Sequence, residues 1–503
     1  MLCCAVHCPA QDGLLDPFFG TAGIVITDIN GFNDVANDLV IQQDGKIIAA
    51  GFTSDGIKDF FCLIRYHPNG SLDTNFGSNG IVITNFPFTS VGTTIALQED
   101  NKIILAGQTW TGDVNTFALA RYLENGHLDI NFGDGGMLTT VFPGTNSVGT
   151  AIAIQNDGKI ILGGHTFVIG NDADDFALAR YHPNGQLDDS FGNGGLVTTD
   201  FGIPAMDWLN DLQLQADGKI IAAGFSDHTF TLVRYLINGQ LDASFGINGV
   251  VKTVFPTGDF GSIKSIDIQA DNKIVAAGFV LDSFSNFALT RYLPSGELDL
   301  DFGDEGITIS RLSATNDGIN TIQIQADGKI VAGGVINENT TRHFALARYQ
   351  PNGYLDPTFG DNGVQTTLIH TTTNVLNAIA IQNDHNIVAA GFSGDYPYNI
   401  TLTRYTSNIV GTENMAFFPG QLSLYPNPFK DYVTIEYDLD ASYNISMYLL
   451  NAQGQFIQNI IKNEQASQGN NQLKLDLSAY PAGTYFINFQ IEDKPYSIQL
   501  FKT

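Results

Sequence analysis

Short apolar runs separated by turn signals cover most of the chain. In the first complete unit, runs at 38–42, 46–52, 60–66 and 80–84 predict four β-strands. An Asp-Gly turn at 44–45 predicts a tight hairpin between the first two. The runs are continuous rather than alternating, which is typical of sheets that are covered on both faces. The pattern therefore predicts an all-β chain.

Three sequence markers recur seven times along the chain in the same cyclic order. They are Asp-Gly-Lys or a near variant in the first turn, Arg-Tyr at the end of the third strand, and Leu-Asp-x-x-Phe-Gly before the fourth strand. Successive Arg-Tyr pairs lie 54 to 59 residues apart. Such self-similarity indicates a repeat architecture, in which each unit buries its faces against its neighbours. The Arg-Tyr pairs begin at Arg65, Arg121, Arg180, Arg234, Arg291, Arg348 and Arg404.

Seven units of four antiparallel strands predict a seven-bladed β-propeller over 15–405. The chain opens with a fourth-type strand at 23–27, and its last unit ends with a third-type strand at 400–405. We expect these two strands to pair, so that one blade is built from both ends and closes the ring. The alternative is an open β-solenoid, which requires capping repeats that the sequence does not show.

The repeats resemble the delta-60 repeat, a β-propeller repeat of bacterial proteins. The resemblance rests on the three markers and is broken at Asp384-His385-Asn386, where the lysine is lost. It implies the propeller fold and no particular biochemical activity.

The periodicity ends after residue 405. Residues 406–420 contain Ser, Asn, Gly and Pro without a period and are interpreted as a linker, and 421–503 form a separate unit. Short apolar segments separated by turns predict a small immunoglobulin-like β-sandwich there. The expected strands are 422–425, 433–438, 443–450, 472–477, 483–491 and 497–501.

Two motifs mark this second unit. It opens with Tyr-Pro-Asn-Pro-Phe at 425–429, and Leu-Ser-Ala-Tyr-Pro-Ala-Gly-Thr-Tyr follows at 477–485. The unit resembles the type A C-terminal sorting domain of the type IX secretion system. That resemblance implies export through the type IX machinery of a Gram-negative bacterium, followed by release or by attachment to a surface lipopolysaccharide. It assigns the export signal to Tyr425, Pro426, Asn427, Pro428, Gly483, Tyr485 and Lys502. The alternative to a sorting domain is an ordinary carbohydrate-binding or adhesive sandwich.

The N-terminal segment 1–10 is short and mostly small or apolar, and it is expected to be a truncated secretory signal peptide. A meaningless N-terminal stub is the alternative. Cys3, Cys4 and Cys8 lie here with His7, but their spacing does not fit a zinc site. The fourth cysteine, Cys62, aligns with alanines of other repeats and is expected to be a small buried residue.

The net charge of the chain limits the kinds of molecule that it can bind. The 503 residues carry a net charge of -29, which argues against nucleic acid and anionic lipid as ligands. No apolar run approaches the roughly 18 residues of a membrane span. The resemblance to the sorting domain implies a secreted or outer-membrane surface protein of a Gram-negative bacterium. The repeated arginines are expected to pair with a repeat aspartate or with turn carbonyls.

Candidate ligand-binding residues lie in loops that differ between the units. In a propeller, loops between second and third strands and between fourth and first strands share one face, and here those loops vary. Exposed aromatic side chains there would stack on a glycan or a protein ligand, whereas local packing is the alternative. The candidates are Trp110, Trp208, Tyr396 and Tyr398.

One run of acidic residues in a variable loop suggests a cation-binding site. Asp172, Asp174 and Asp175 offer oxygen ligands for Ca²⁺, although the run lacks the glycine and distal glutamate of an EF-hand. No other cofactor is predicted.

Catalytic motifs are not visible in the sequence: it has no nucleophile elbow, phosphate loop or metal-ligand cluster. The leading hypothesis is therefore a non-enzymatic, exported binding or adhesion scaffold. The alternatives are a secreted polysaccharide-active enzyme with a carboxylate pair on the variable face, and a structural surface-layer protein.

Overall fold

The computed structural model describes residues 12–168, 174–202, 206–256, 260–338, 341–407, 422–426, 429–451, 456–491 and 494–502. Every regular element in these ranges is a β-strand, which agrees with the predicted fold class. The proposed signal segment 1–10 and the residues Asp172, Asn427 and Pro428 lie outside the described residues. The chain forms two compact units. One is Phe18–Gln382 with Ile387–Arg404, and Tyr405–Thr503 belongs to the other.

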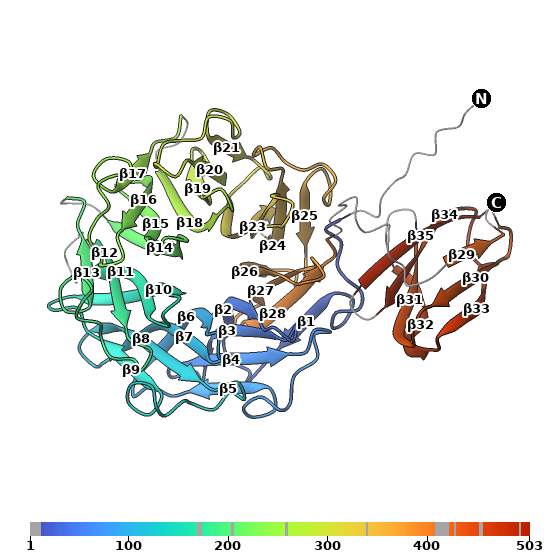
Figure 1. Ribbon diagram of the computed structural model, residues 1–503, viewed down its shortest axis with the longest axis horizontal. Coiled ribbons are helices and arrows are strands. Elements are labelled where there is room, and N and C mark those ends of the chain that lie inside the picture. Colours follow the sequence, from blue (N-terminus) through green and yellow to red (C-terminus); the bar gives the residue numbers. More distant parts are fainter. Residues whose placement is uncertain are drawn as a thin grey trace. The chain divides into compact units, whose positions relative to one another are not determined.

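Seven antiparallel four-stranded sheets form the propeller, and they surround a common axis with β2, β6, β10, β14 and β18 innermost (Figure 1). Blades 1 to 6 each use four consecutive strands. These are β2 (Asp34–Ile41), β3 (Ile47–Ser54), β4 (Asp59–Tyr66), β5 (Ile81–Thr84); β6 (Ser90–Leu97), β7 (Ile103–Trp110), β8 (Asn115–Tyr122), β9 (Met137–Thr140); β10 (Asn146–Ile154), β11 (Ile160–Phe167), β12 (Asp174–Tyr181), β13 (Leu196–Thr199); β14 (Asp207–Leu214), β15 (Ile220–Ser226), β16 (Thr229–Tyr235), β17 (Val250–Thr253); β18 (Phe260–Ile268), β19 (Ile274–Leu281), β20 (Ser285–Tyr292), β21 (Ile307–Ser310); and β22 (Asp317–Ile324), β23 (Ile330–Glu338), β24 (Thr341–Tyr349), β25 (Val364–Thr367).

Blade 7 is built from both ends of the propeller. It contains β26 (Thr373–Ile381), β27 (Ile387–Gly394) and β28 (Asn399–Tyr405), and its fourth strand is β1 (Ile24–Thr27). β1 runs antiparallel to β28, with Ile24 opposite Thr403. The predicted closure of the ring is thereby confirmed.

Each innermost strand carries a β-bulge that the sequence did not reveal. In blade 1 the first strand begins at Asp34 rather than at residue 38, and its register shifts between Ala36 and Asp38. Gly51 faces this bulge, and a Cβ there would lie 2.0 Å from the Val35 carbonyl oxygen. Glycine is therefore needed opposite the bulge. The glycines at this position are Gly51, Gly107, Gly164, Gly224, Gly278, Gly334 and Gly391.

The repeated arginines join strands within a blade and blades to one another. Arg65 places Nε 2.9 Å from Asp73, and its Nη1 donates to the Glu124 carbonyl of the next blade at 2.5 Å. Burial raises the pKa of Asp73, but the Asn75 amide and the charges of Arg65 and Lys46 outweigh it, so the net shift is downward. Both expected kinds of partner are present.

Apolar residues fill the spaces between adjacent blades. In β3, Ile47 and Ile48 point to opposite faces of the sheet, and both are fully buried. The free thiol of Cys62 is buried in the same layer as Ile47, as expected for a small filler. Burial on both faces explains why the strands are continuous apolar runs.

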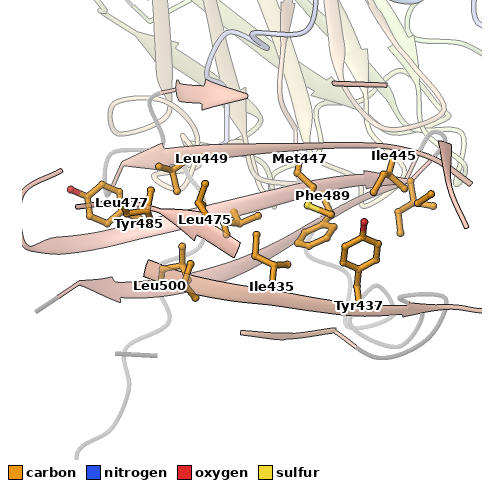
Figure 2. Packing of buried hydrophobic residues seen from close by; sticks show 14 of the residues in the cluster. Ile435, Tyr437, Ile445, Met447, Leu449, Leu475, Leu477, Tyr485, Phe489 and Leu500 are labelled. Carbon is orange, nitrogen blue, oxygen red and sulfur yellow. The ribbon is translucent and has the colours of Figure 1, made fainter. Parts of the chain in front are cut away.

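The second unit is a sandwich of two antiparallel sheets, one of three strands and one of four. Figure 2 shows Ile435 and Tyr437 from one sheet and Met447 and Phe489 from the other pointing into the shared core. The sheets are β29 (Leu422–Tyr425), β30 (Tyr432–Leu439), β33 (Gly469–Asp476), and β32 (Phe456–Ala466), β31 (Tyr443–Asn451), β34 (Gly483–Ile491), β35 (Lys494–Lys502).

Sequence patterning missed strand β32. Its residues are mostly polar and half-buried or exposed, and its pairing with β31 shifts register three times. An edge strand with this composition lacks the regular alternation that identifies a half-buried strand.

Candidate functional site

Both tryptophans lie on the propeller face that carries the variable loops. Trp110 is the last residue of β7, and Trp208 is the second residue of β14. Placing them in loops was wrong, because strand pairing continues through them, with Trp110 opposite Asn115 and Trp208 opposite Phe225. The two residues therefore stand on rigid elements at the base of the loops.

Trp208 is the centre of a group of side chains from blades 3 and 4. Its indole stacks on His165 with ring centres 5.1 Å apart and planes 10° apart. The indole N–H donates to the carboxylate of Asp174. The ring of Phe225 packs against the indole with ring centres 5.4 Å apart, yet 37% of Trp208 stays exposed. Its orientation is thus fixed while part of the ring system is open to a ligand.

The aromatic contacts continue into blade 5. Phe225 contacts Phe260 at 5.3 Å, and Phe260 stacks on Phe279 at 5.8 Å. We call His165, Trp208, Phe225, Phe260 and Phe279 the aromatic row.

His165 is buried without a hydrogen bond to Nδ1 among the described residues. It is 9% exposed, and burial, with a smaller effect of the Lys264 charge, lowers its pKa to about 4. The imidazole is therefore neutral at physiological pH.

A ring of bulge residues lies around the axis, one in each innermost strand. In six blades the bulge side chain donates to the carbonyl group beside the bulge of the next blade, at 2.6 to 2.9 Å. These contacts link six of the seven pairs of neighbouring blades. The six residues are Asn37, Thr93, Thr150, Asn210, Asn320 and Asn377.

Lys264 is the seventh bulge residue, and it departs from this pattern. Its Nζ lies 6.0 Å from the centre of the Phe279 ring, at the end of the aromatic row. Burial lowers the pKa of Lys264. A partly desolvated ammonium thus stands where the other blades place a short neutral donor.

Two aspartates of the innermost strands have raised pKa values. Asp211 accepts hydrogen bonds from the Ile266 and Leu212 amides, yet burial raises its pKa to about 7. Asp38 stands at the equivalent position in blade 1, and burial raises its pKa to about 6. Backbone donors occupy both carboxylates, so they serve the ring structure.

The structure separates the acidic residues proposed for Ca²⁺. Asp174 is bound to Trp208, whereas Asp175 lies beside Asp200 and Asp207. One carboxylate oxygen from each of these last three residues lies within 4.8 Å of the other two. Burial raises the pKa of Asp207 to about 6, against the opposing effects of Ser226, Phe201 and Lys252.

The remaining aromatic candidates lie in other blades. Tyr396 and Tyr398 form a T-shaped pair with ring centres 5.8 Å apart, and Tyr396 is 76% exposed. Tyr398 also contacts Phe392 at 4.8 Å. Among the ring contacts of the described residues, none joins Trp110 or this tyrosine pair to Trp208.

Sequence reasoning missed His165, Lys264, Asp200 and Asp207. Aligning the repeats by the bulge would have found Lys264, because it stands where four blades carry asparagine and two carry threonine. The approach of His165 to Trp208 across two blades has no signal in a single sequence.

In the second unit, three of the described sorting residues surround one turn. Lys502 Nζ donates to the carbonyl oxygens of Leu477 and Tyr480 at 2.7 and 2.6 Å. The Tyr485 hydroxyl donates to the Pro481 carbonyl at 2.7 Å. Gly483 pairs with Lys502 between β34 and β35. These residues shape the 477–485 motif.

The first sorting motif lies on the other sheet. The Tyr425 hydroxyl donates to Glu436 at 2.8 Å and accepts from Gln472 at 2.8 Å. Its side chain is 43% exposed, and the peptide bond to Pro426 is cis.

Membrane-spanning helices were sought in the described part of the chain, and no helix there is long and apolar enough to cross a bilayer.

Two family models match the chain. The secretion system C-terminal sorting domain matches residues 423–502. A β-propeller domain of unknown function, DUF5122, matches six segments, which are 42–76, 98–132, 155–191, 215–245, 269–302 and 325–359. No curated protein matches the chain.

Solved structures with distant similarity include a surface component of the type IX secretion system. That protein, PorZ of Porphyromonas gingivalis, is 11% identical with a TM-score of 0.42; the match covers 95% of this chain and 60% of PorZ. Polysaccharide lyase Uly1 is 11% identical with a TM-score of 0.42, over 74% of this chain and 90% of the lyase. Sqt1 from Chaetomium thermophilum is 10% identical with a TM-score of 0.38, over 75% of this chain and 98% of Sqt1.

Proposed function

This chain is a DUF5122 β-propeller protein with a secretion system C-terminal sorting domain, and from this we propose that it acts outside the cell as a non-enzymatic binding or adhesion scaffold. The sorting domain marks it as a protein delivered to the cell surface or secreted by the type IX machinery. Its propeller is the exported part that would meet a ligand. Attachment to a surface lipopolysaccharide would hold this scaffold at the cell.

One observation supports the binding role above the others. Trp208 is held in place by His165, Asp174 and Phe225, yet more than a third of its surface is exposed on the variable face. Fixing an aromatic ring before binding reduces the entropy that is lost when a ligand stacks on it. A glycan or a peptide with an apolar face would suit this surface.

Tryptophan fluorescence tests the binding role. The chain has two tryptophans, so emission of the full-length protein reports on Trp110 and Trp208 alone. We expect surface glycans to cause a saturable emission change that persists in Trp110→Phe and disappears in Trp208→Phe. If no glycan or peptide changes the emission of the unmodified protein, a structural surface-layer role gains support and the binding role loses it.

Deletion of residues 421–503 tests the export route in the native host. We expect the truncated propeller to accumulate intact in the periplasm, because it lacks the sorting domain. Normal surface delivery of the truncation would contradict the assignment of that domain.

A polysaccharide-active enzyme is the second candidate, and the cluster of Asp175, Asp200 and Asp207 is the observation in its favour. Asp207 is fully buried, whereas Asp175 is half-buried and Asp200 is exposed on the variable face. Burial and the charges of Asp200 and Asp174 raise the pKa of Asp175. A carboxylic acid with a raised pKa can protonate a glycosidic oxygen near neutral pH. Turnover of a glycan panel that Asp175→Asn abolishes would favour this candidate.

A further inference from the structure

Within the described part of the chain, the ammonium group of Lys264 lies 6.0 Å from the centre of the Phe279 ring but has no hydrogen-bond or ion-pair partner. Neither a hydrogen bond nor an ion pair reaches its Nζ there, although the other six bulge side chains each bind the next blade. Burying a charged group without a counter-charge is costly. Asparagine satisfies the same position in four blades, so a lysine is not required to build the ring.

The charged groups near Lys264 do not compensate it. Asp211, in the neighbouring blade, is occupied by the Ile266 and Leu212 amides. Asp267, three residues further along β18, accepts from the Ile324 and Ile268 amides. The other titratable neighbour is the neutral His165. None of these groups neutralises the half-buried ammonium, which leaves it available to an anion from outside the chain.

The surroundings of Lys264 define what kind of anion fits. Its Nζ lies at the Phe279 end of the aromatic row, and the row leads to the exposed indole of Trp208. A pyranose ring presents a flat C–H face that stacks on an indole, and an acidic sugar carries an oxyanion beside it. The row therefore suits a sugar with a charged substituent.

We propose that Lys264 and Trp208 form the binding site for an acidic saccharide, with the sugar's oxyanion on the Lys264 ammonium and a sugar face on the Trp208 indole. This inference rests on the proposed binding role and names its ligand class. The shared chemistry is an oxyanion, which a uronate carboxylate or a sulfate ester supplies. The overall charge of -29 does not exclude such a ligand, because salt screens charges beyond about 8 Å at physiological ionic strength.

Titrations of the full-length protein, followed by tryptophan emission, test the inference. The probes are a glucuronate-containing oligosaccharide, a sulfated galactan oligosaccharide, and a neutral glucose oligosaccharide of the same length. We expect at least one acidic probe to bind at least 10-fold more tightly than the neutral one. The comparison of the two acidic probes separates carboxylate from sulfate.

Lys264→Asn is the central variant, because asparagine fills this position in four other blades. We expect it to fold and to bind the acidic probe at least 10-fold more weakly, with neutral binding unchanged. Lys58→Asn is the matched control: it removes the same charge from a loop of the same face, where Lys58 donates to Asn85. Lys264→Gln serves as a second variant, and thermal melts check the folding of all three.

The outcomes separate this inference from the role on which it rests. Equal binding of acidic and neutral probes by the unmodified protein overturns the inference but leaves the binding role in place. Unchanged acidic binding by a folded Lys264 variant does the same. Binding of none of the three probes overturns the inference, and the binding role itself then depends on the peptide and surface-glycan titrations.

Discussion

Arg234 shows how one side chain serves several parts of a blade. Its Nε contacts Asp242 at 2.8 Å, and Nη1 donates to the Pro294 carbonyl of the next blade at 2.6 Å. Nη2 donates to Ser244 at 3.1 Å, and the guanidinium lies 4.5 Å from the centre of the Phe245 ring. A planar group with several donors can satisfy all these partners, which an ammonium cannot.

Replacing this arginine should destabilise the propeller strongly. Arg234→Met removes the Nε partner of the buried Asp242 carboxylate and leaves Lys219, 3.2 Å away, as its remaining counter-ion. We therefore expect the free energy of unfolding to fall by about 3 kcal/mol, the lower end of the range for a broken buried ion pair. Urea denaturation measures the change. Arg311→Met is the control, because Arg311 forms a solvent-exposed ion pair with Asp282, and it should cost much less than Arg234→Met. Similar losses in the two variants would contradict the framework role.

Aspartates of the propeller should give its stability an optimum in mildly acidic solution. In Asp188 the raising effect of burial is outweighed by Ser190 and the charges of Arg180 and Lys159, so its pKa falls to about 2. Stability from this group is complete above its ordinary pKa of 3.8 and is lost as the pH falls towards 2. Asp211 acts in the opposite direction: between about pH 4 and 7 the folded state holds a proton that the unfolded state releases, so stability falls as the pH rises.

Asp211→Asn tests the alkaline side of this optimum. We expect the urea midpoint of the unmodified protein to be lower at pH 8 than at pH 5, and the difference to shrink in Asp211→Asn. Asp189→Asn removes a charge from an exposed position and should keep the full difference. An undiminished pH 5 to pH 8 difference in Asp211→Asn would show that this carboxyl does not titrate as inferred.

At the scale of the element, the bulge in the innermost strand and the glycine opposite it depend on each other. The bulge turns a polar side chain towards the next blade, and this is possible because the opposite strand has no Cβ at that point. In blade 4 a Cβ on Gly224 would lie 1.8 Å from the Trp208 carbonyl oxygen. The same glycine therefore also positions the indole proposed for ligand binding.

Gly224→Ala should consequently harm both stability and the site. We expect a loss of about 1–3 kcal/mol from the forced backbone shift, with a change in Trp208 emission. Gly318→Ala is the matched control, because a Cβ at Gly318 in β22 meets nothing within 4 Å. Thermal melts and emission spectra distinguish the two variants, and an equal effect of both would refute the argument.

The same elements show what the sequence can reveal. The four-stranded unit follows from apolar runs and turn residues, because both faces of each blade are buried. The start of each innermost strand does not, since the polar bulge residue after Ala36 interrupts the run and resembles a loop. Likewise, Trp208 and Asp174 were candidates from sequence, but their contact with each other and with His165 depends on how blades 3 and 4 meet.

At the scale of the whole molecule, two sets of hydrogen bonds between neighbouring blades hold the ring together. Arginines bind turn carbonyls of the next blade, and bulge residues bind the next innermost strand. Both sets also join blade 7 to blade 1, where the ring closes. Arg404 donates to the Pro68 carbonyl at 2.5 Å, and Asn377 donates to the Ala36 carbonyl at 2.9 Å. Seven repeats in sequence predicted the ring, and the order of the markers predicted its seam.

Lys502 stabilises the 477–485 motif of the sorting unit. Lys502→Met removes the donor to the carbonyls of Leu477, Ser478 and Tyr480, so we expect the 477–485 motif to lose order. Faster proteolysis within this unit and reduced export are the expected results, measured by limited digestion and by cell fractionation. Lys462→Met, in the edge strand β32, is the control and should change neither. Normal digestion with lost export would instead indicate that the secretion machinery reads Lys502 directly.

The pairing of β1 with β28 depends on the order in which the chain is synthesised. β1 is made first and remains without its partner until Asn399–Tyr405 has been translated, and the sorting unit is translated after that. A chain that terminates early therefore lacks both the seam and the export signal. In this arrangement a ribosome that stops short produces a protein that does not reach the cell surface, so the molecules found there are those whose ring has the residues to close.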